Sequence, residues 1–220
     1  MTKSLRITSL LVINVTLILL SGCISSFDET RIVDPDETYI GEGFTAKAPP
    51  GGHWLIIYQR PGGIGMGKLV PGFVNTPDHT LVVSVQVLKI SPNQPAEILG
   101  ARNYREFLDA LEIDIRNSYR NSQRHNLISL KVSPYLYGDY FCAREDIVEE
   151  EYGNPKHPGV ILEITARGFQ CLDSSRKFTV LASYSERKPK ESESILRTQL
   201  QPEGEVFLKN VVVTPYKPNN

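Results

Sequence analysis

The chain has 220 residues, with 24 Lys and Arg against 25 Asp and Glu, and a formal net charge of −1. A nearly neutral, mixed-sign composition gives no long-range attraction to nucleic acid or to anionic lipid, so we expect no nucleic-acid partner. Hydrophobic residues make up 40% of the sequence, which at this length is enough for one packed core.

The first residues have the three parts of a secretory signal peptide. Lys3 and Arg6 give a cationic start, an apolar run covers residues 7–20, and small residues follow it. A transmembrane anchor is the alternative, but a helix needs about 20 apolar residues to cross a bilayer, and this run is shorter and contains polar residues. We therefore expect residues 1–22 to be a signal peptide.

The end of this segment, Leu20-Ser21-Gly22-Cys23, resembles the lipobox of bacterial lipoproteins. In that family the Cys thiol receives a diacylglyceryl group, the chain is cut just before the Cys, and the new amine is often acylated. The resemblance implies that Cys23 is the first mature residue and attaches the protein to a membrane, since two or more acyl chains anchor stably and a single chain does not. An ordinary signal peptide with a Cys at its exit is the alternative.

Removal of residues 1–22 would leave 198 residues with 22 basic and 25 acidic side chains, a formal net charge of −3. In enterobacterial lipoproteins an Asp after the lipidated Cys favours the inner membrane. Here that residue is Ile24, which favours the outer membrane facing the periplasm. Residues 23–38 are rich in Ser, Asp, Glu and Thr and are expected to be a lipidated tether, followed by a single globular domain over 39–220.

The first part of this domain is predicted to form strands at 43–48, 54–58 and 80–88, with a short candidate at 68–70. Between them, Gly62 to Leu69 almost spells a phosphate-binding loop, with Gly67 and Lys68 at the required spacing. Leu69 stands where a Ser or Thr should hold Mg²⁺, and Pro71 would break the helix that should follow. We therefore expect a hairpin or surface loop here and no nucleotide or other cofactor.

The period of the apolar residues changes over residues 103–119. Six of them recur at three- and four-residue steps, which predicts an amphipathic helix packed on the core; these are Tyr104, Phe107, Leu108, Leu111, Ile115 and Tyr119. Asn103 and Glu106 are spaced as a capping pair at its start.

Strands are predicted again at 127–132, 135–148, 160–172 and 177–184. Cys142 and Cys171 lie in two of these runs, and an even pair of cysteines in an oxidising compartment predicts a disulfide. Two buried free thiols are the alternative, and a redox pair is disfavoured because no Cys-x-x-Cys is present.

A strong turn signal at 153–159 separates the two cysteine-bearing runs. If they form an antiparallel hairpin folded about residue 156 or 157, Cys142 and Cys171 face each other. The same register pairs Asp146 with Arg167, Ile147 with Ala166 and, unfavourably, Glu150 with Glu163.

The chain is expected to close with a short helix at 191–200, a helical turn at 206–208 and a last apolar segment at 211–213. This α+β order, a mostly antiparallel sheet with an intervening and a closing helix, is similar to the PsbP/Mog1-type α/β/α sandwich. Gly43-Phe44, Pro49-Pro50 and Trp54 also resemble that fold. Its members mostly act as assembly factors or binding modules, so the resemblance implies no catalysis.

No catalytic or metal-binding constellation is evident in the sequence. His53, His79, His125 and His157 are scattered without zinc-ligand spacing, and His79 is read as a solvated turn residue. The acidic run Glu149-Glu150-Glu151 is interpreted as a solvated strand end. We therefore expect a non-enzymatic envelope lipoprotein that binds an envelope protein or a cell-wall component. The alternative is an envelope hydrolase whose site forms only in three dimensions.

Overall fold

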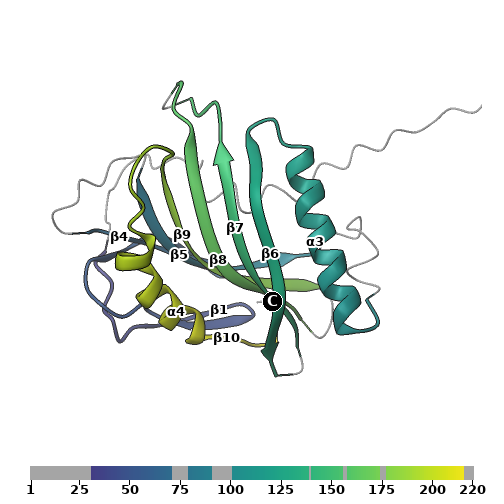
Figure 1. Cartoon of the computed structure of the whole chain (residues 1–220). Coiled ribbons are helices and arrows are strands. Elements are labelled where there is room, and N and C mark those ends of the chain that lie inside the picture. The colour runs from purple at the N-terminus through teal and green to yellow at the C-terminus, as the bar shows by residue number, and fades with distance from the viewer. Residues whose placement is uncertain are drawn as a thin grey trace, which may run out of the picture.

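The computed structural model of the chain describes residues 31–70, 79–90, 101–138, 140–155, 158–173 and 177–215. It is an α+β fold built on antiparallel sheets, as the sequence predicted (Figure 1). In the described part of the chain, neither helix combines the length and apolar character needed to span a membrane.

A seven-stranded antiparallel sheet forms the centre of the domain, in the order β3-β4-β5-β9-β8-β7-β6. Its strands are β3 (Trp54–Arg60), β4 (Gly63–Lys68), β5 (Thr80–Lys89), β6 (His125–Tyr137), β7 (Tyr140–Glu151), β8 (Leu162–Leu172) and β9 (Phe178–Pro189). A second sheet, in the order β1-β2-β10, consists of β1 (Thr38–Gly41), β2 (Phe44–Lys47) and β10 (Val211–Val213).

The two faces of the large sheet are covered by different elements, because side chains alternate between the faces along each strand. Helix α3 (Tyr104–Arg120) packs with Ala143 on one side, which we call the α3 face. Helix α4 (Gln201–Lys209), the π-helical turn η1 (Leu196–Leu200) and the three-stranded sheet cover the other side, the α4 face. Figure 1 shows α3 beside β6, and α4 in front of the lower part of the sheet.

The predicted helix and the predicted hairpin register are both confirmed. Asn103 caps α3, and its side-chain oxygen accepts a hydrogen bond from the Glu106 backbone N–H at 3.0 Å. Strands β7 and β8 pair with the expected partners, namely Cys142 with Cys171, Asp146 with Arg167, Ile147 with Ala166 and Glu150 with Glu163. The turn signal and the cross-strand chemistry were therefore sufficient to fix this hairpin.

Three predicted boundaries were wrong. The run 135–148 is two strands, because Gly138 turns the chain with a φ of 53°. The closing helix begins later than expected, at η1, and continues without a break through α4. The short strand expected at 68–70 lies earlier, as β4, and forms the predicted hairpin with β3; the alternative of a surface loop was wrong, since Ile64 and Met66 are fully buried.

The end of the predicted tether already belongs to the folded domain. Ile32 forms a β-bridge with Leu55, and Val33 is buried against the core. The Val33 backbone N–H also donates to the Trp54 carbonyl at 2.9 Å. Residues 31–33 therefore belong to the folded domain, because their backbone pairs with strand β3 and the Val33 side chain is buried.

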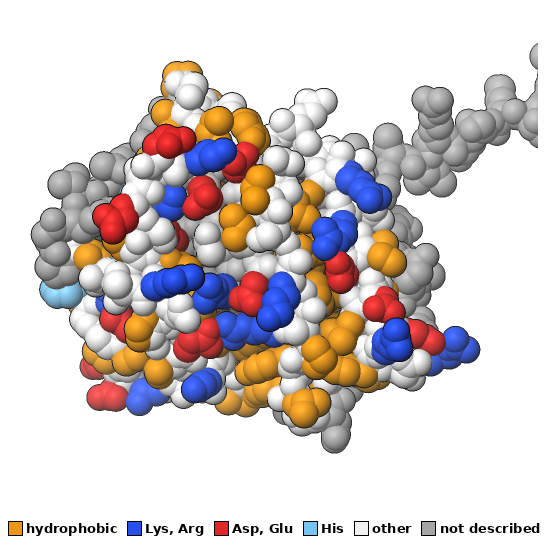
Figure 2. All heavy atoms as spheres, in the orientation of Figure 1, with side chains coloured by type: hydrophobic (Ala, Val, Ile, Leu, Met, Phe, Trp, Pro, Cys, Tyr) orange, Lys and Arg blue, Asp and Glu red, His pale blue; other side chains and the backbone are white. Residues whose placement is uncertain are grey.

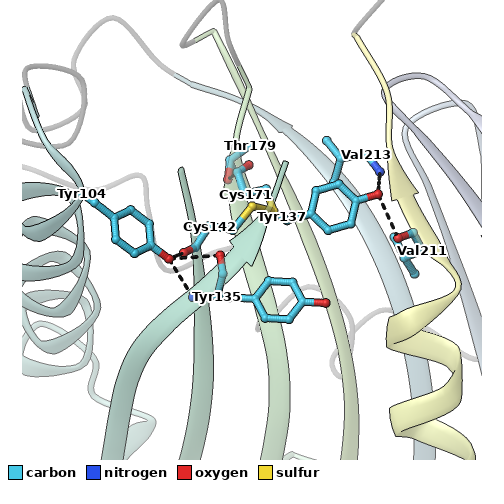
Figure 3. The surroundings of a disulfide bond; sticks show 8 residues. All are labelled: Tyr104, Tyr135, Tyr137, Cys142, Cys171, Thr179, Val211 and Val213. Atoms are coloured by element: carbon cyan, nitrogen blue, oxygen red, sulfur yellow. Dashed lines mark hydrogen bonds between the residues drawn. A yellow bond between two sulfur atoms is a disulfide. The ribbon is translucent and has the colours of Figure 1, made fainter. Parts of the chain in front are cut away.

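Cys142 and Cys171 are joined by a disulfide with an S–S distance of 2.07 Å, and both are fully buried on the α4 face (Figure 3). From the other face of the sheet, the Tyr104 hydroxyl of α3 accepts a hydrogen bond from the Tyr135 backbone N–H at 2.7 Å and donates to the Cys142 carbonyl. Helix α3 is thereby tied to the strand pair β6–β7 next to the disulfide.

Candidate functional site

Two adjoining hollows open on the α4 face (Figure 2). The larger, about 490 Å³, is the arginine hollow, lined by Arg167, Arg197, Gln201, Pro202 and Glu205 from β8, η1 and α4. The smaller, about 260 Å³, is the strand hollow, which lies over β6, β7 and β8 and shares Arg167. The two hollows meet at Arg167, and we call them together the recess, which extends from the start of α4 to the edge strand β6.

The chemistry of the strand hollow follows from the register of its three strands. Cys142 lies in the core on the α4 face, so alternation along β7 places Asp146 and Val148 on that face as well. Their cross-strand partners on β6 and β8 share the face, which gives the side-chain set Ser129, Lys131, Asp146, Val148, Thr165 and Arg167. Five of these six side chains are polar or charged.

Glu205, which lines the arginine hollow, belongs to an internal ion pair. Arg144 donates from both Nη atoms to the Glu205 carboxylate, at 3.2 Å to Oε2, and the Tyr184 hydroxyl donates to Oε1 at 2.6 Å. Burial alone would raise the pKa of Glu205, but the hydrogen bonds from Arg144 and Tyr184 hold it below its ordinary value. The Glu205 charge is thus already neutralised within the protein.

Arg167 and Arg197 are positioned differently. The Arg167 Nε atom lies 3.6 Å from Asp146 Oδ1, which is an ion pair but too long for a hydrogen bond. Arg197 is exposed and makes no ion pair with another residue in the described ranges. Figure 2 shows Lys and Arg side chains gathered in the centre of this face, with Asp and Glu side chains among them. The recess therefore presents positive charge that the protein does not itself hydrogen-bond to a carboxylate.

The histidines do not contribute to the recess. His79 is buried and its Nε2 lies 2.7 Å from Glu186, so its reading as a solvated turn residue was wrong. His125 is also buried, with Nδ1 3.4 Å from Glu149. His53 is exposed, and His157 lies outside the described residues. In the part of the chain that the structure describes, no three His, Cys, Asp or Glu side chains are grouped as metal ligands.

The acidic run at the end of β7 is not solvated as expected. Glu149, Glu150 and Glu151 are all buried. Glu151 accepts hydrogen bonds from Arg124 and Arg187, and Glu150 forms an ion pair with Lys190 at 2.7 Å. The cationic partners of Glu150 and Glu151 compensate the buried charges of these two carboxylates and join neighbouring segments of the fold.

The lysine of the apparent phosphate-binding loop has a structural role. Lys68 is buried, and its Nζ donates to Glu203 of α4 at 2.6 Å, while the Trp54 Nε1 donates to the same carboxylate at 2.8 Å. The three side chains join the start of α4 to β3 and β4. Cys23, the predicted lipidation site, lies outside the described residues.

The sequence did not single out Arg144, Arg197 or Glu205 as site residues. Arg144 carried a usable signal, since it follows Cys142 by two positions on a strand whose register was predicted and therefore shares its face. No local pattern connects it to η1 or α4, about 50 to 60 residues further on.

The geometry defines an α+β domain with an open, positively charged recess on one sheet face. No family model and no curated protein matches the sequence. Solved structures with similar folds include LpqN of Mycobacterium tuberculosis, described as involved in cell envelope biogenesis, at 12% identity and a TM-score of 0.42, covering 85% of this chain and 91% of that one.

Two further similar structures belong to the fold that the sequence resembles. The Ran-binding protein Mog1p of Saccharomyces cerevisiae has 10% identity and a TM-score of 0.44 over 85% of this chain and 97% of its own. Cyanobacterial PsbP of Synechocystis sp. PCC 6803 has 12% identity and a TM-score of 0.38 over 88% and 98%. Likenesses of this degree concern the path of the chain, and function is argued below from the site.

Proposed function

We propose that this chain is a lipid-anchored bacterial envelope protein that binds an envelope protein or a cell-wall component and does not catalyse a reaction. The lipobox ending at Cys23 supports attachment to a membrane through lipid, and Ile24 favours the outer membrane facing the periplasm. The binding role rests on one observation, the open recess on the α4 face. Its two guanidinium groups are not hydrogen-bonded to a carboxylate of the described chain.

The geometry gives less support to the hydrolase alternative. A hydrolase would need a general base and its partner at the surface of an accessible cavity. The two His–carboxylate contacts, His79 with Glu186 and His125 with Glu149, involve four buried side chains. None of the four lines either hollow. Binding is therefore the function that fits the recess best.

Photocrosslinking in a bacterial host tests the binding role. A photoreactive phenylalanine replaces Gln201, which lines the arginine hollow, in the full-length chain. The matched control places the same residue at Ile113, which is 60% exposed on α3. We expect a crosslink to an envelope protein or to cell-wall material from position 201 and not from position 113. No crosslink from 201, or the same products from both positions, would contradict binding at the recess.

The anchor is tested separately with the full-length chain. Labelled palmitate should enter the wild-type protein and not Cys23→Ser, and membrane fractionation should place the wild type with the outer membrane. Equal labelling of both proteins would refute lipidation at Cys23. Labelled protein in the inner membrane would refute the assignment from Ile24 while leaving the anchor intact.

A further inference from the structure

We propose that the recess binds an anionic glycan, a hydroxyl-rich polymer whose carboxylate or phosphate group lies between Arg167 and Arg197. This inference rests on the proposed binding function and names the chemistry of its ligand. It follows from the charges left in the arginine hollow and from the side chains that continue from it across the sheet.

The arginine hollow presents two guanidinium groups that are not hydrogen-bonded to a carboxylate of the described chain. Arg144 and Glu205 neutralise each other through two hydrogen bonds. Arg167 has an ion pair with Asp146 that is too long for a hydrogen bond, and Arg197 has none among the described residues. A guanidinium presents several N–H donors in a plane that matches a carboxylate or phosphate, so an anionic group is the ligand that these two side chains fit.

Glu205 does not oppose this assignment although it also lines the hollow. One oxygen accepts from both Arg144 and Tyr184, and the other accepts from Arg144. A carboxylate with its charge compensated in this way repels an incoming anion much less than a free one would. Its contact with Arg144 joins α4 to strand β7.

The strand hollow indicates what carries the anionic group. Its side chains on the α4 face are hydroxyl, amine, carboxylate and guanidinium groups, with Val148 as the apolar member. The centre of a stable protein–protein interface is enriched in apolar and aromatic side chains and depleted of charge. The polar lining here instead offers hydrogen bonds to a hydroxyl-rich chain that continues from the anionic group toward β6, past Ser129 and Thr165.

Binding measurements on the purified full-length protein in detergent test the proposal. The probes are polygalacturonate, which carries a carboxylate on every sugar, neutral dextran of similar length, polyglutamate, and inorganic phosphate. We expect polygalacturonate to bind and dextran not to bind. Binding should also weaken as ionic strength rises, since the contacts are charged and partly exposed.

The variants Arg167→Gln and Arg197→Gln should each weaken polygalacturonate binding about tenfold, the effect of losing one charge-assisted contact of about 1.4 kcal/mol. Arg105→Gln, which makes the same charge change at an exposed position on α3, should leave binding unchanged. Equal loss in all three variants, or equal binding of dextran, would overturn the proposal, because charge at the hollow would then not be recognised.

The remaining outcomes separate this inference from the proposed function. Polyglutamate bound as tightly as polygalacturonate, with the same loss in both hollow variants, would replace the glycan by an acidic polypeptide. Tight binding of phosphate alone would indicate a small-anion site and also overturn the polymer. A specific crosslink from position 201 without any dependence on Arg167 or Arg197 would refute the anionic ligand and leave binding at the recess in place.

Discussion

Glu145 gives a sharp prediction about how stability depends on pH. It lies on the α3 face of β7, opposite Val132 of β6 and Gly168 of β8. Its side chain is buried, and its Oε1 atom has no hydrogen-bond partner. Burial raises the pKa of Glu145 to about 7, because removal from water disfavours the charged form.

The raised pKa of Glu145 determines whether the free energy of unfolding rises or falls with pH. The native state holds the Glu145 proton more tightly than the unfolded state, whose pKa is near 4.5. The stabilisation by the neutral acid is therefore complete below about pH 4.5, falls as pH rises toward 7, and is lost above it. A difference of about 2.5 pKa units at 1.36 kcal/mol each corresponds to roughly 3 kcal/mol.

Glu145→Gln should remove this dependence, since the amide is neutral at every pH. We expect urea unfolding at about pH 8 to show the variant more stable than the wild type by up to roughly 3 kcal/mol, and the two to be similar at about pH 4. Glu112→Gln, an exposed carboxylate of α3 paired with Arg116, is the matched control, with a change of about 0.5 kcal/mol or less. The same difference between Glu145→Gln and wild type at both pH values would refute the reasoning.

Three further changes test the packing. Replacing Cys142 and Cys171 together by Ala should lower the free energy of unfolding by about 3–4 kcal/mol, the chain-entropy value for this separation of 29 residues, and reduction of the wild type should give a similar fall in urea unfolding. Glu203→Ala leaves the buried Lys68 charge without its carboxylate and should cost about 2–3 kcal/mol by thermal unfolding, whereas adding Lys68→Met should recover part of that loss. Tyr104→Phe should cost about 1–2 kcal/mol in urea, since two backbone groups lose their partner, and no change would contradict the bridging role of the hydroxyl.

The parts of the fold that could be predicted are those whose information is local. Helix α3 has a 3.6-residue apolar period and its own cap at Asn103, so sequence alone places it correctly. The β7–β8 hairpin has a turn signal at its centre and complementary pairs such as Asp146 with Arg167 along its length. Each element is specified by residues within it, and tertiary contacts did not change the outcome.

Strand β4 shows why other elements could not be predicted. Its glycines lack the side chains that give a strand its pattern, and the neighbouring strands supply the packing instead. The Tyr58 ring lies over Gly65, where a Cβ would come within 2.2 Å of Tyr58 Cε1. Glycine is required there because of a contact made by another strand, which no local pattern in β4 reveals.

The recess was unpredictable for a similar reason. Arg167 could be placed on a face from the hairpin register, but its neighbours Arg197 and Gln201 come from η1 and α4. The start of α4 is held by the contact of Glu203 with Lys68 of β4. In the sheet, β4 is separated from β8, which carries Arg167, by β5 and β9. Exposed arginines form a candidate binding site only when such distant contacts bring them together.

Strand β10 is one of the two outer strands of the small sheet, and an outer strand can pair with strands of other molecules. Here the free edge of β10 is hydrogen-bonded to a side chain of the same molecule. The Tyr137 hydroxyl accepts from the Val213 N–H at 3.0 Å and donates to the Val211 carbonyl at 3.5 Å (Figure 3). If lipid concentrates many copies on one membrane, such a protected edge would guard against aggregation. A single side chain on β6 would then help to keep crowded neighbours as separate molecules.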